Sequence, residues 1–263
     1  MGLHEQHIRD AARLLLEARA QGVRLAQLPH ALRPRDSAHA EAICEAMAAG
    51  FERPLGGWKI GCIDPRAPTK LGLEGPFCGR IPARLIYRSG AHLPWRELMR
   101  PVVEAEIALR LARDLPARST PWSREDIAAA VDAALPAIEI PESRLQDDHA
   151  LGWLGMVADQ GYAGRLICGS GIAGWRGLDL AAQAVTLRID GQDVAHGSGA
   201  RAMGHPLDAL VWLANHRSRR GDGLEAGQIV STGSLTGIHW TRPGAHVVAE
   251  YPGLGQVEVV LDP

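Results

Sequence analysis

The sequence predicts an α+β domain in which a helical N-terminal arm precedes a β-rich body. Over residues 1–50, apolar side chains recur at a spacing of three to four, which is typical of amphipathic helices. From Gly56 onward, glycines and prolines separate short apolar runs, which is typical of strands joined by turns. Because there is no repeat or linker, residues 1–263 are expected to form one domain, with the body at residues 56–263.

The composition indicates a globular protein without a nucleic-acid or membrane partner. Hydrophobic residues make up 46% of the chain and charged residues 22%, which is enough for a sizeable core. The net charge of -2 lacks the basic excess of domains that bind phosphate backbones. There is no apolar run of about 18 residues and no secretory signal at residues 1–10. The four cysteines include no CxxC pair, which favours buried free thiols in a reducing cytoplasm.

The arm is predicted to contain two helices. The first covers His4 to Ala20 and ends at Gly22, a residue type that commonly stops helices. The second is capped by Ser37 and continues to Met47. In both helices the apolar residues fall on one side, so we expect these helices to pack against the body and to carry no chemistry of their own.

The body is predicted to consist mostly of strands, with two further helices. Ser123 opens an alanine-rich helix, with Asp126 as the acidic partner of a capping box, and Pro136 ends it. Pro206, at a first helical turn, begins the other helix. The Asp190-Gly191 pair predicts a β-hairpin. The predicted strands are 58–63, 102–111, 137–140, 184–189, 192–195, 228–232 and 245–251.

The strand at residues 102–111 carries the clearest chemical signal. Residues two apart in a strand share a face, so Glu104 and Glu106 lie side by side, opposite an apolar face. Two carboxylates separated by roughly 6–7 Å repel each other unless a cation or solvent screens them. Ligation by oxygen alone suits Mg²⁺, Mn²⁺ or Ca²⁺ better than zinc. A solvated strand face is the alternative interpretation.

A third carboxylate belongs to Glu139, which lies within the otherwise apolar segment 136–140. A lone buried glutamate is costly, so this side chain needs a partner. Together with Glu104 and Glu106 it would form an open metal site with positions left for water or substrate. Pairing of one of these carboxylates with Arg144 is the structural alternative.

Two more segments are candidates for contact with a substrate. Lys59 has glycines on both sides in the segment 56–61, which indicates close approach of the backbone to another group. This lysine would transfer protons or bind a carboxylate, unless it lies on the surface. In the segment 231–237, small residues can turn backbone N–H groups and hydroxyls, including those of Ser234 and Thr236, toward an anion. An ordinary glycine-rich turn is the alternative.

Together these segments resemble the 2-keto-4-pentenoate hydratase branch of the fumarylacetoacetate hydrolase superfamily, which includes 2-oxohept-4-ene-1,7-dioate hydratase and 4-oxalocrotonate decarboxylase. The resemblance covers nearly the whole chain, and its markers occur in order. The markers are Gly57–Gly61, Pro101–Ile107, Pro136–Ile140, Ser143-Arg144, Ala158-Asp159, Gly204–Leu207, Gly223–Gly227 and Thr232–Gly237. The resemblance implies that a mixed β-sandwich roll with flanking helices follows the arm.

The resemblance also implies roles for particular residues. The implied ligands of a Mg²⁺ or Mn²⁺ ion are Glu104, Glu106 and Glu139. Lys59 would lie beside that ion as a catalytic acid or base. Glu74 is the only acidic residue in the stretch 73–79, where relatives that hydrate often carry an aspartate, so it is the candidate for the second catalytic group. The implied substrate-binding residues are Asp159, Ser234 and Thr236.

The function implied by the resemblance is that of a divalent-metal-dependent hydratase. It would add water to a small 2-hydroxydienoate or 2-oxo-enoic acid, such as 2-hydroxypenta-2,4-dienoate, in the catabolism of aromatic compounds. A 4-oxalocrotonate-type decarboxylase and an acylpyruvate hydrolase use the same enolate chemistry and are the alternatives, with a non-enzymatic homologue that serves as an assembly partner as a third. The protein is expected to be cytoplasmic and homo-oligomeric, either a dimer or a ring of dimers.

Overall fold

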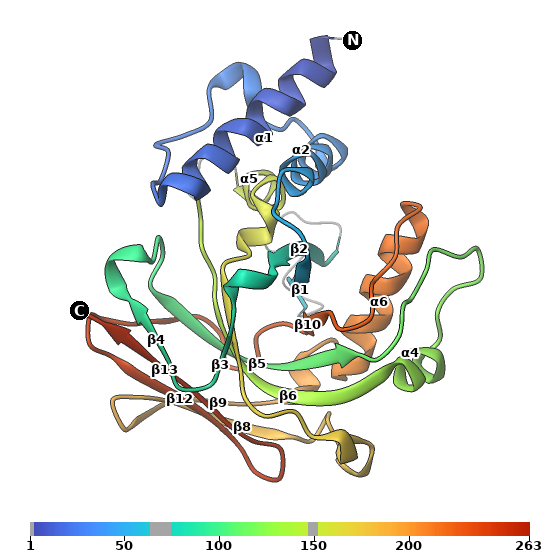
Figure 1. Cartoon of the computed structure of the whole chain (residues 1–263), viewed down its shortest axis with the longest axis vertical. Helices are drawn as coiled ribbons and strands as arrows, with labels where there is room; N and C mark the ends of the chain where they lie inside the picture. The colour runs from blue at the N-terminus through green and yellow to red at the C-terminus, as the bar shows by residue number, and fades with distance from the viewer. Residues whose placement is uncertain (1–2, 64–74, 147–151) are drawn as a thin grey trace.

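The computed structural model describes residues 3–63, 75–146 and 152–263, and its helical arm lies at one end of a β-rich body (Figure 1). The arm consists of α1 (Leu3–Gln21) and α2 (Ser37–Ala49), which pack with α5 (Gly152–Ala158) around a separate apolar core. Gly22 has a φ of +65°, so the predicted stop after the first helix is confirmed. The predicted cap at Ser37 is wrong by one residue, because the Asp36 side chain accepts the hydrogen bond from the His39 N–H at 2.8 Å.

The body contains two facing sheets of mixed strand direction. In the described residues, the larger sheet has the order β2 (Phe77–Pro82), β1 (Leu55–Gly61), β10 (Ile229–Ser231), β5 (Val102–Leu111), β6 (Val131–Ile140), β7 (Arg165–Cys168) and β3 (Ile86–Arg88), with β11 (His239–Trp240) paired to β5. The smaller sheet has the order β4 (Ala91–Pro94), β13 (Gly255–Asp262), β12 (His246–Tyr251), β8 (Ala184–Ile189) and β9 (Gln192–Ser198). Parallel pairs such as β1–β10 occur beside antiparallel ones such as β5–β6.

The inner faces of the two sheets share one apolar core, which includes Ile107 and Leu109 from the larger sheet and Val247 from the smaller one. Tyr251 of β12 links the sheets, because its hydroxyl donates to the Glu106 carbonyl at 2.6 Å and to the Ala137 carbonyl at 3.1 Å. The prediction of an α+β fold, with a helical arm followed by a mixed β-sandwich roll and flanking helices, is confirmed.

Two helices flank the body, α4 (Arg124–Ala130) and α6 (Pro206–Arg219). The predicted capping box of Ser123 and Asp126 is present, but the prediction that this helix continues to Pro136 is wrong. The helix ends at Ala130, and the chain enters β6, where Leu135 lies opposite Ala108 of β5. Alanine favours helices, but helix propensity is a weak determinant, and the long pairing with a buried strand overrides it.

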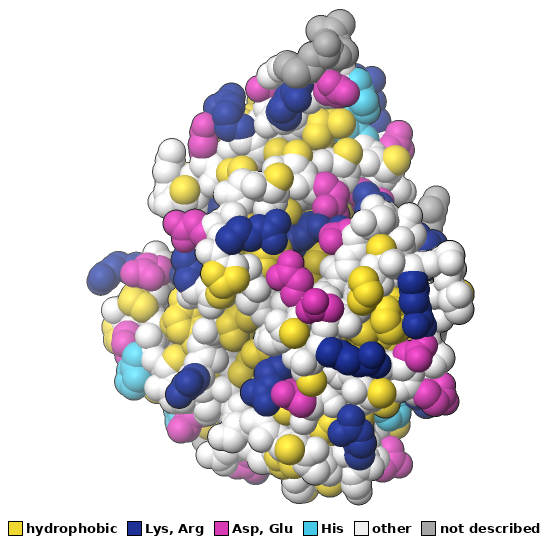
Figure 2. Space-filling model, turned by 45° about the vertical axis from the view of Figure 1, so that its right-hand side comes forward, with side chains coloured by type: hydrophobic (Ala, Val, Ile, Leu, Met, Phe, Trp, Pro, Cys, Tyr) yellow, Lys and Arg dark blue, Asp and Glu magenta, His cyan; other side chains and the backbone are white. Residues whose placement is uncertain are grey.

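The remaining short elements are 3₁₀ turns at His30–Leu32, Ala83–Leu85, Trp95–Glu97, Gln160–Tyr162, Ala173–Gly177 and Gly199–Arg201. The predicted hairpin at Asp190-Gly191 is confirmed, since both residues have positive φ and join β8 to β9. In the part of the chain that the structure describes, no helix is both long enough and apolar enough to cross a membrane. Charged side chains of both signs cross the surface between the arm and the body (Figure 2).

Candidate metal centre

Three buried carboxylates meet where β5 and β6 pair. Glu104 of β5 lies directly opposite Glu139 of β6, and Glu106 lies two residues further along β5. One carboxylate oxygen of each residue lies within 4.8 Å of the others. The exposed fractions are 8% for Glu104, 1% for Glu106 and 0% for Glu139. The alternative of a solvated strand face is therefore wrong, because β5 is buried on both faces along most of its length.

Glu106 is held in place from the side of β10. The Ser231 hydroxyl and, at 2.7 Å, the Gly233 N–H donate to the same Glu106 oxygen. Burial and, to a lesser extent, the charge of Glu104 raise the pKa of Glu106, and although Lys59 and the two hydrogen bonds oppose this, the resulting pKa is about 7. The raised pKa means that the ionised form of Glu106 is disfavoured, and a bound cation would stabilise that form.

Glu139 is the least satisfied group of the cluster. Neither of its carboxylate oxygens has a hydrogen-bond partner among the described residues, and its nearest cation is Lys59, whose Nζ lies 3.5 Å from Oε2. Burial raises the pKa of Glu139 well above its ordinary value, and the neighbouring glutamates add to this. Because a buried carboxylate without hydrogen bonds is costly, the donor set fits a hard divalent cation that prefers oxygen ligands.

Lys59 lies in the middle of β1, next to Ser231 in the parallel pair with β10. It is 5% exposed, so the alternative of a surface lysine is wrong. Burial lowers the pKa of Lys59, but the charges of Glu139, Glu104 and Glu106 outweigh burial and leave this pKa raised. In the absence of a cation, the lysine is therefore an ammonium group that partly neutralises the carboxylates.

The neighbouring Trp58 faces away from the cluster, as alternation along a strand requires. Its indole Nε1 donates to Gln228 at 2.9 Å, and the Arg80 guanidinium lies 4.5 Å from its ring centroid. The strand thus places one apolar anchor and one charged group on opposite faces.

Arg144 does not pair with the glutamates, so that alternative is wrong. Its Nε lies 2.5 Å from Oδ1 of Asp159, and both side chains are 0% exposed. The backbone N–H of Arg144 donates to the other Asp159 oxygen at 2.7 Å. This pair fastens the chain after β6 to the end of α5. Asp159 is not among the residues that line the cavity beside the glutamates.

A cavity of about 280 Å³ opens beside the cluster. Lys59, Glu104, Glu106 and Ser234 line it, together with mostly apolar side chains. The predicted substrate-binding residue Thr236 lies outside it, and its hydroxyl accepts a hydrogen bond from the Ala105 N–H at 3.1 Å. Glu74, the candidate second catalytic group, lies outside the described residues.

The cavity wall also includes a turn at residues 160–162 whose conformation the sequence did not predict. Gln160, Gly161 and Tyr162 have successive φ values of 55°, 57° and 61°. Non-glycine residues rarely adopt this left-handed conformation, and such strain clusters at functional sites. Gly161 and Tyr162 line the cavity, and so does Arg100, just before β5. The only local signal for the turn was one glycine, and Arg100 resembled any other surface arginine.

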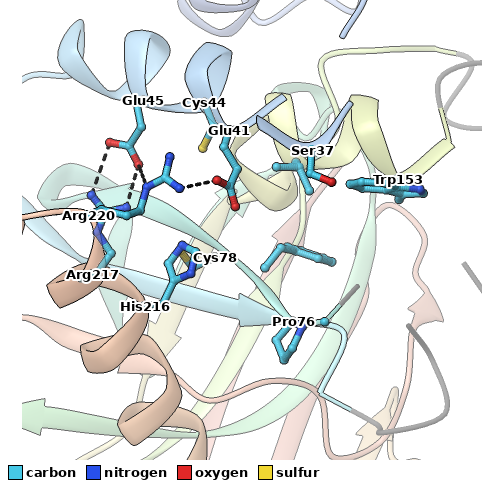
Figure 3. Close-up of a pocket in the computed structure, with 13 residues that line it drawn as sticks. Ser37, Glu41, Cys44, Glu45, Pro76, Cys78, Trp153, His216, Arg217 and Arg220 are labelled. Atoms are coloured by element: carbon cyan, nitrogen blue, oxygen red, sulfur yellow. Dashed lines mark hydrogen bonds and ion pairs between the residues drawn. The ribbon is translucent and has the colours of Figure 1, made fainter. Parts of the chain in front are cut away.

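A smaller cavity of about 90 Å³ lies between α2 and α6 (Figure 3). Figure 3 shows that it is bordered by ion pairs, including one between Arg217 and Glu45 with an N–O distance of 2.7 Å. Burial raises the pKa of the Cys78 thiol to about 11, so this thiol is protonated at neutral pH. This cavity is about a third of the volume of the cavity beside the glutamates.

Comparisons with known proteins agree with this geometry. The chain matches the family described as fumarylacetoacetate (FAA) hydrolase C-terminal over residues 68–261. It is 35% identical over 261 residues to a 2-keto-4-pentenoate hydratase of Burkholderia vietnamiensis, covering 98% of each chain. It is 30% identical over 201 residues to a 4-oxalocrotonate decarboxylase of Pseudomonas putida, covering 76% of this chain and 75% of that one. The fold is similar to the solved structure of 4-oxalocrotonate decarboxylase from Pseudomonas putida G7 complexed with magnesium and adipate, with a TM-score of 0.87, 25% identity and 98% of each chain covered.

Proposed function

The chain belongs to the fumarylacetoacetate hydrolase family, in the branch of the 2-keto-4-pentenoate hydratases, and from this premise we propose that it is a divalent-metal-dependent hydro-lyase. Its substrate is a small 2-hydroxydienoic or 2-oxo-enoic acid, such as 2-hydroxypenta-2,4-dienoate. The cavity of about 280 Å³ lies near the lower end of the usual range for small-molecule sites, roughly 300–1,000 Å³. This size favours a short-chain acid.

The observation that carries the proposal is the cluster of Glu104, Glu106 and Glu139. Three buried carboxylates, one of them without a hydrogen-bond partner among the described residues, are costly without a cation. All-oxygen ligation suits Mg²⁺ or Mn²⁺, and the solved 4-oxalocrotonate decarboxylase structure contains magnesium. A divalent cation held by these residues would supply Lewis-acid stabilisation of the negative charge that develops on the 2-oxygen of the substrate.

The chain's own residues would then handle protons and orientation. Lys59 is within ion-pair distance of Glu139 and lines the cavity, so its Nζ is placed to deliver a proton to a carbon of the dienol and to recover one later. Ser231 and Gly233 keep Glu106 in a fixed orientation through their hydrogen bonds. Ser234 lines the cavity, which supports a role for it in substrate binding. In the first step the dienol loses its enol O–H proton and gains a proton at C5, which gives the 2-oxo-3-enoic acid. Water then adds across C3=C4, with its hydroxyl at C4 and its proton at C3.

Several finer features belong to the same proposal. Glu74 is the candidate for the group that activates the water. The metal is Mg²⁺ or Mn²⁺, and the protein is a cytoplasmic homo-oligomer, a dimer or a ring of dimers. Residues 1–263 act as one domain whose arm, residues 1–50, supports the body. Asp159 and Thr236 are further candidates for substrate binding, and their side chains accept hydrogen bonds from the backbone N–H groups of Arg144 and Ala105.

The direct test is turnover of 2-hydroxypenta-2,4-dienoate, 4-oxalocrotonate and acetopyruvate with Mg²⁺ or Mn²⁺ supplied. We expect loss of the dienoate absorbance with formation of a 4-hydroxy-2-oxo acid, and loss of activity on addition of EDTA. Absence of hydration at concentrations of Mg²⁺ and of Mn²⁺ that saturate the enzyme would contradict the proposal.

A decarboxylase is the second candidate, because the chain is similar to 4-oxalocrotonate decarboxylase both in sequence and in fold. The two activities differ in their products. A decarboxylase releases CO₂ from 4-oxalocrotonate and leaves a dienol, whereas a hydratase consumes the dienol. Measuring CO₂ and hydrated product in the same reaction separates the two.

A further inference from the structure

A further cavity, of about 440 Å³, lies where the end of α1 meets the body. It shares none of its described lining residues with the cavity beside the glutamates. The described residues that line it include two glutamates, Glu97 and Glu142, and four arginines. The arginines come from four elements: Arg19 from α1, Arg84 and Arg96 from two 3₁₀ turns, and Arg165 from β7. Four arginines and two glutamates give this lining a net charge of +2, in a chain whose net charge is -2.

Two of these arginines already have carboxylate partners. Arg165 is only 8% exposed and forms an ion pair with the buried Glu142. The Arg84 Nε lies 3.3 Å from a carboxylate oxygen of Glu52, but these side chains are 57% and 80% exposed, so solvent screens the pair. The positive charge that the chain leaves unbalanced in the cavity is therefore mainly that of the other two arginines.

Arg19 is the least satisfied of the four. Its Nη1 donates to the Ala163 carbonyl at 3.1 Å, and its central carbon lies 5.0 Å from the ring centroid of Phe51. Its Nη2 is buried and has no hydrogen-bond partner among the described residues. Burial and, to a lesser extent, the charge of Arg144 lower the pKa of Arg19 to about 9, although nearby carboxylates oppose this. A small turn of the guanidinium toward the cavity would let an anion supply the missing acceptor.

A phosphate group suits this arrangement better than a carboxylate does. A carboxylate is planar, and one arginine can satisfy both of its oxygens. A phosphomonoester has three acceptor oxygens and a charge of about −1.5 to −2 at neutral pH, so guanidinium groups from different elements can each bind a different oxygen. Arg96 is available for this, because it is exposed and has no hydrogen bond or ion pair with a described residue. The volume of the cavity leaves room for a small organic group beside the phosphate.

We propose that this cavity is a second ligand site, which binds a small phosphomonoester through Arg19, Arg84 and Arg96. Arg165 remains paired with Glu142. The carboxyl end of α1 also lines the cavity, and its dipole opposes an anion, so the three arginines must outweigh it. The site uses none of the carboxylates of the candidate metal centre, and the inference is therefore independent of the proposed function.

The test is calorimetry with glycerol 3-phosphate and with inorganic phosphate, in EDTA and again with Mg²⁺. We expect one site per chain, an affinity that differs by less than about threefold between the two conditions, and no binding of glycerol. Arg19→Gln should weaken binding roughly 10- to 100-fold, the usual contribution of a hydrogen bond to a charged group. Arg96→Gln should weaken it less, by about 3- to 10-fold, because Arg96 is exposed. Arg96→Gln also keeps the test valid if Arg19→Gln does not fold.

Arg9→Gln is the matched control, because Arg9 is an exposed arginine of α1 that does not line the cavity. It should leave the affinity unchanged. No saturable binding of either phosphate compound would overturn the inference, and so would wild-type affinity in Arg96→Gln together with a folded Arg19→Gln. Binding that requires Mg²⁺, or that Glu106→Gln abolishes, would place the phosphate at the metal centre and would also overturn it. None of these results bears on whether the protein hydrates a dienoate.

Discussion

Two clusters of charged side chains in the protein differ in how their charge is balanced. Between the arm and the body, Glu45 of α2 receives hydrogen bonds from Arg80 and Arg217. Burial alone would raise the pKa of Glu45, yet these arginines leave it lowered. At the candidate metal centre, Glu139 has no hydrogen-bond partner among the described residues, and its pKa is raised. The charge of Glu45 is balanced by arginines of the chain itself, whereas the carboxylates of the candidate metal centre require a cation from outside the chain.

The difference shows which charged groups serve stability and which serve chemistry. Arginines of the chain itself balance the carboxylates of the partly exposed Glu45 and the fully buried Asp159. Three carboxylates left beside one lysine represent stability given up for ligand binding. Each prediction below perturbs one side of this comparison.

The largest effect is expected at Lys59. Lys59→Met should lower kcat by roughly 10²–10⁴-fold, the usual contribution of a positioned acid or base. Calorimetry should show nearly unchanged Mg²⁺ affinity, since the lysine is not a ligand. Solvent deuterium exchange at C3 of a 2-oxo acid analogue measures the proton step separately from hydration. Wild-type exchange together with wild-type turnover in this variant would show that Lys59 is a bystander.

A large effect on stability is expected at the balanced pair of Arg144 and Asp159. Asp159→Asn leaves a fully buried guanidinium without its counter-charge, and should lower the free energy of unfolding by about 3–5 kcal/mol. Chemical denaturation measures this directly. The double change Arg144→Met with Asp159→Leu should recover much of the loss, because it removes both charges together. Equal destabilisation in the single and double variants would mean that packing, rather than charge, dominates there.

A smaller, pH-dependent effect is expected for metal binding to the unbalanced cluster. The pKa of Glu106 is raised from about 4.5 to about 7, so the folded state binds more protons than the unfolded state between these values. Stability of the metal-free protein should therefore fall as the pH rises through this window. Mg²⁺ at about 100 times its Kd should add about 2.7 kcal/mol, which corresponds to a rise in Tm of roughly 5–10 °C.

The rise in Tm should be largest near pH 7.5 and small near pH 5, where protons occupy the carboxylates. Differential scanning calorimetry with EDTA and with Mg²⁺ at both pH values provides the comparison. A rise that is equal at both values would show that Mg²⁺ binds at groups with ordinary carboxylate pKa values.

The sequence was sufficient where local rules decide the structure. The hairpin at Asp190-Gly191, the helix that begins at Pro206 and the capping box at Ser123 were predicted correctly because each depends on residues a few positions apart. The paired carboxylates of β5 followed from alternation along one strand. The entry of residues 131–136 into β6 could not be predicted, because it depends on the distant partner β5.

The sequence predicted the charged residues of the candidate site, but not the conformation and contacts of the residues that line its cavity. Glu104, Glu106 and Glu139 stand out in the sequence because they interrupt apolar runs. The pairing of Asp159 with Arg144 and the position of Arg100 depend on contacts between segments far apart in the chain. The left-handed conformation of Gln160 and Tyr162 has no local signal beyond the glycine between them. The catalytic roles of Lys59 and Glu74 and the substrate-binding roles of Asp159, Ser234 and Thr236 remain predictions.

The central claim is that Glu104, Glu106 and Glu139 together hold a divalent cation. Isothermal calorimetry of Mg²⁺ and Mn²⁺ binding to the wild-type protein, Glu106→Gln and Glu45→Gln tests it most directly. Glu45→Gln is the control, because it removes a carboxylate that arginines of the chain already balance. The account predicts one metal site per chain. Glu106→Gln should weaken its affinity at least ~100-fold, since even residues that only orient metal ligands contribute 10–100-fold. Glu45→Gln should leave the affinity unchanged. Equal affinity in Glu106→Gln and the wild-type protein would contradict it.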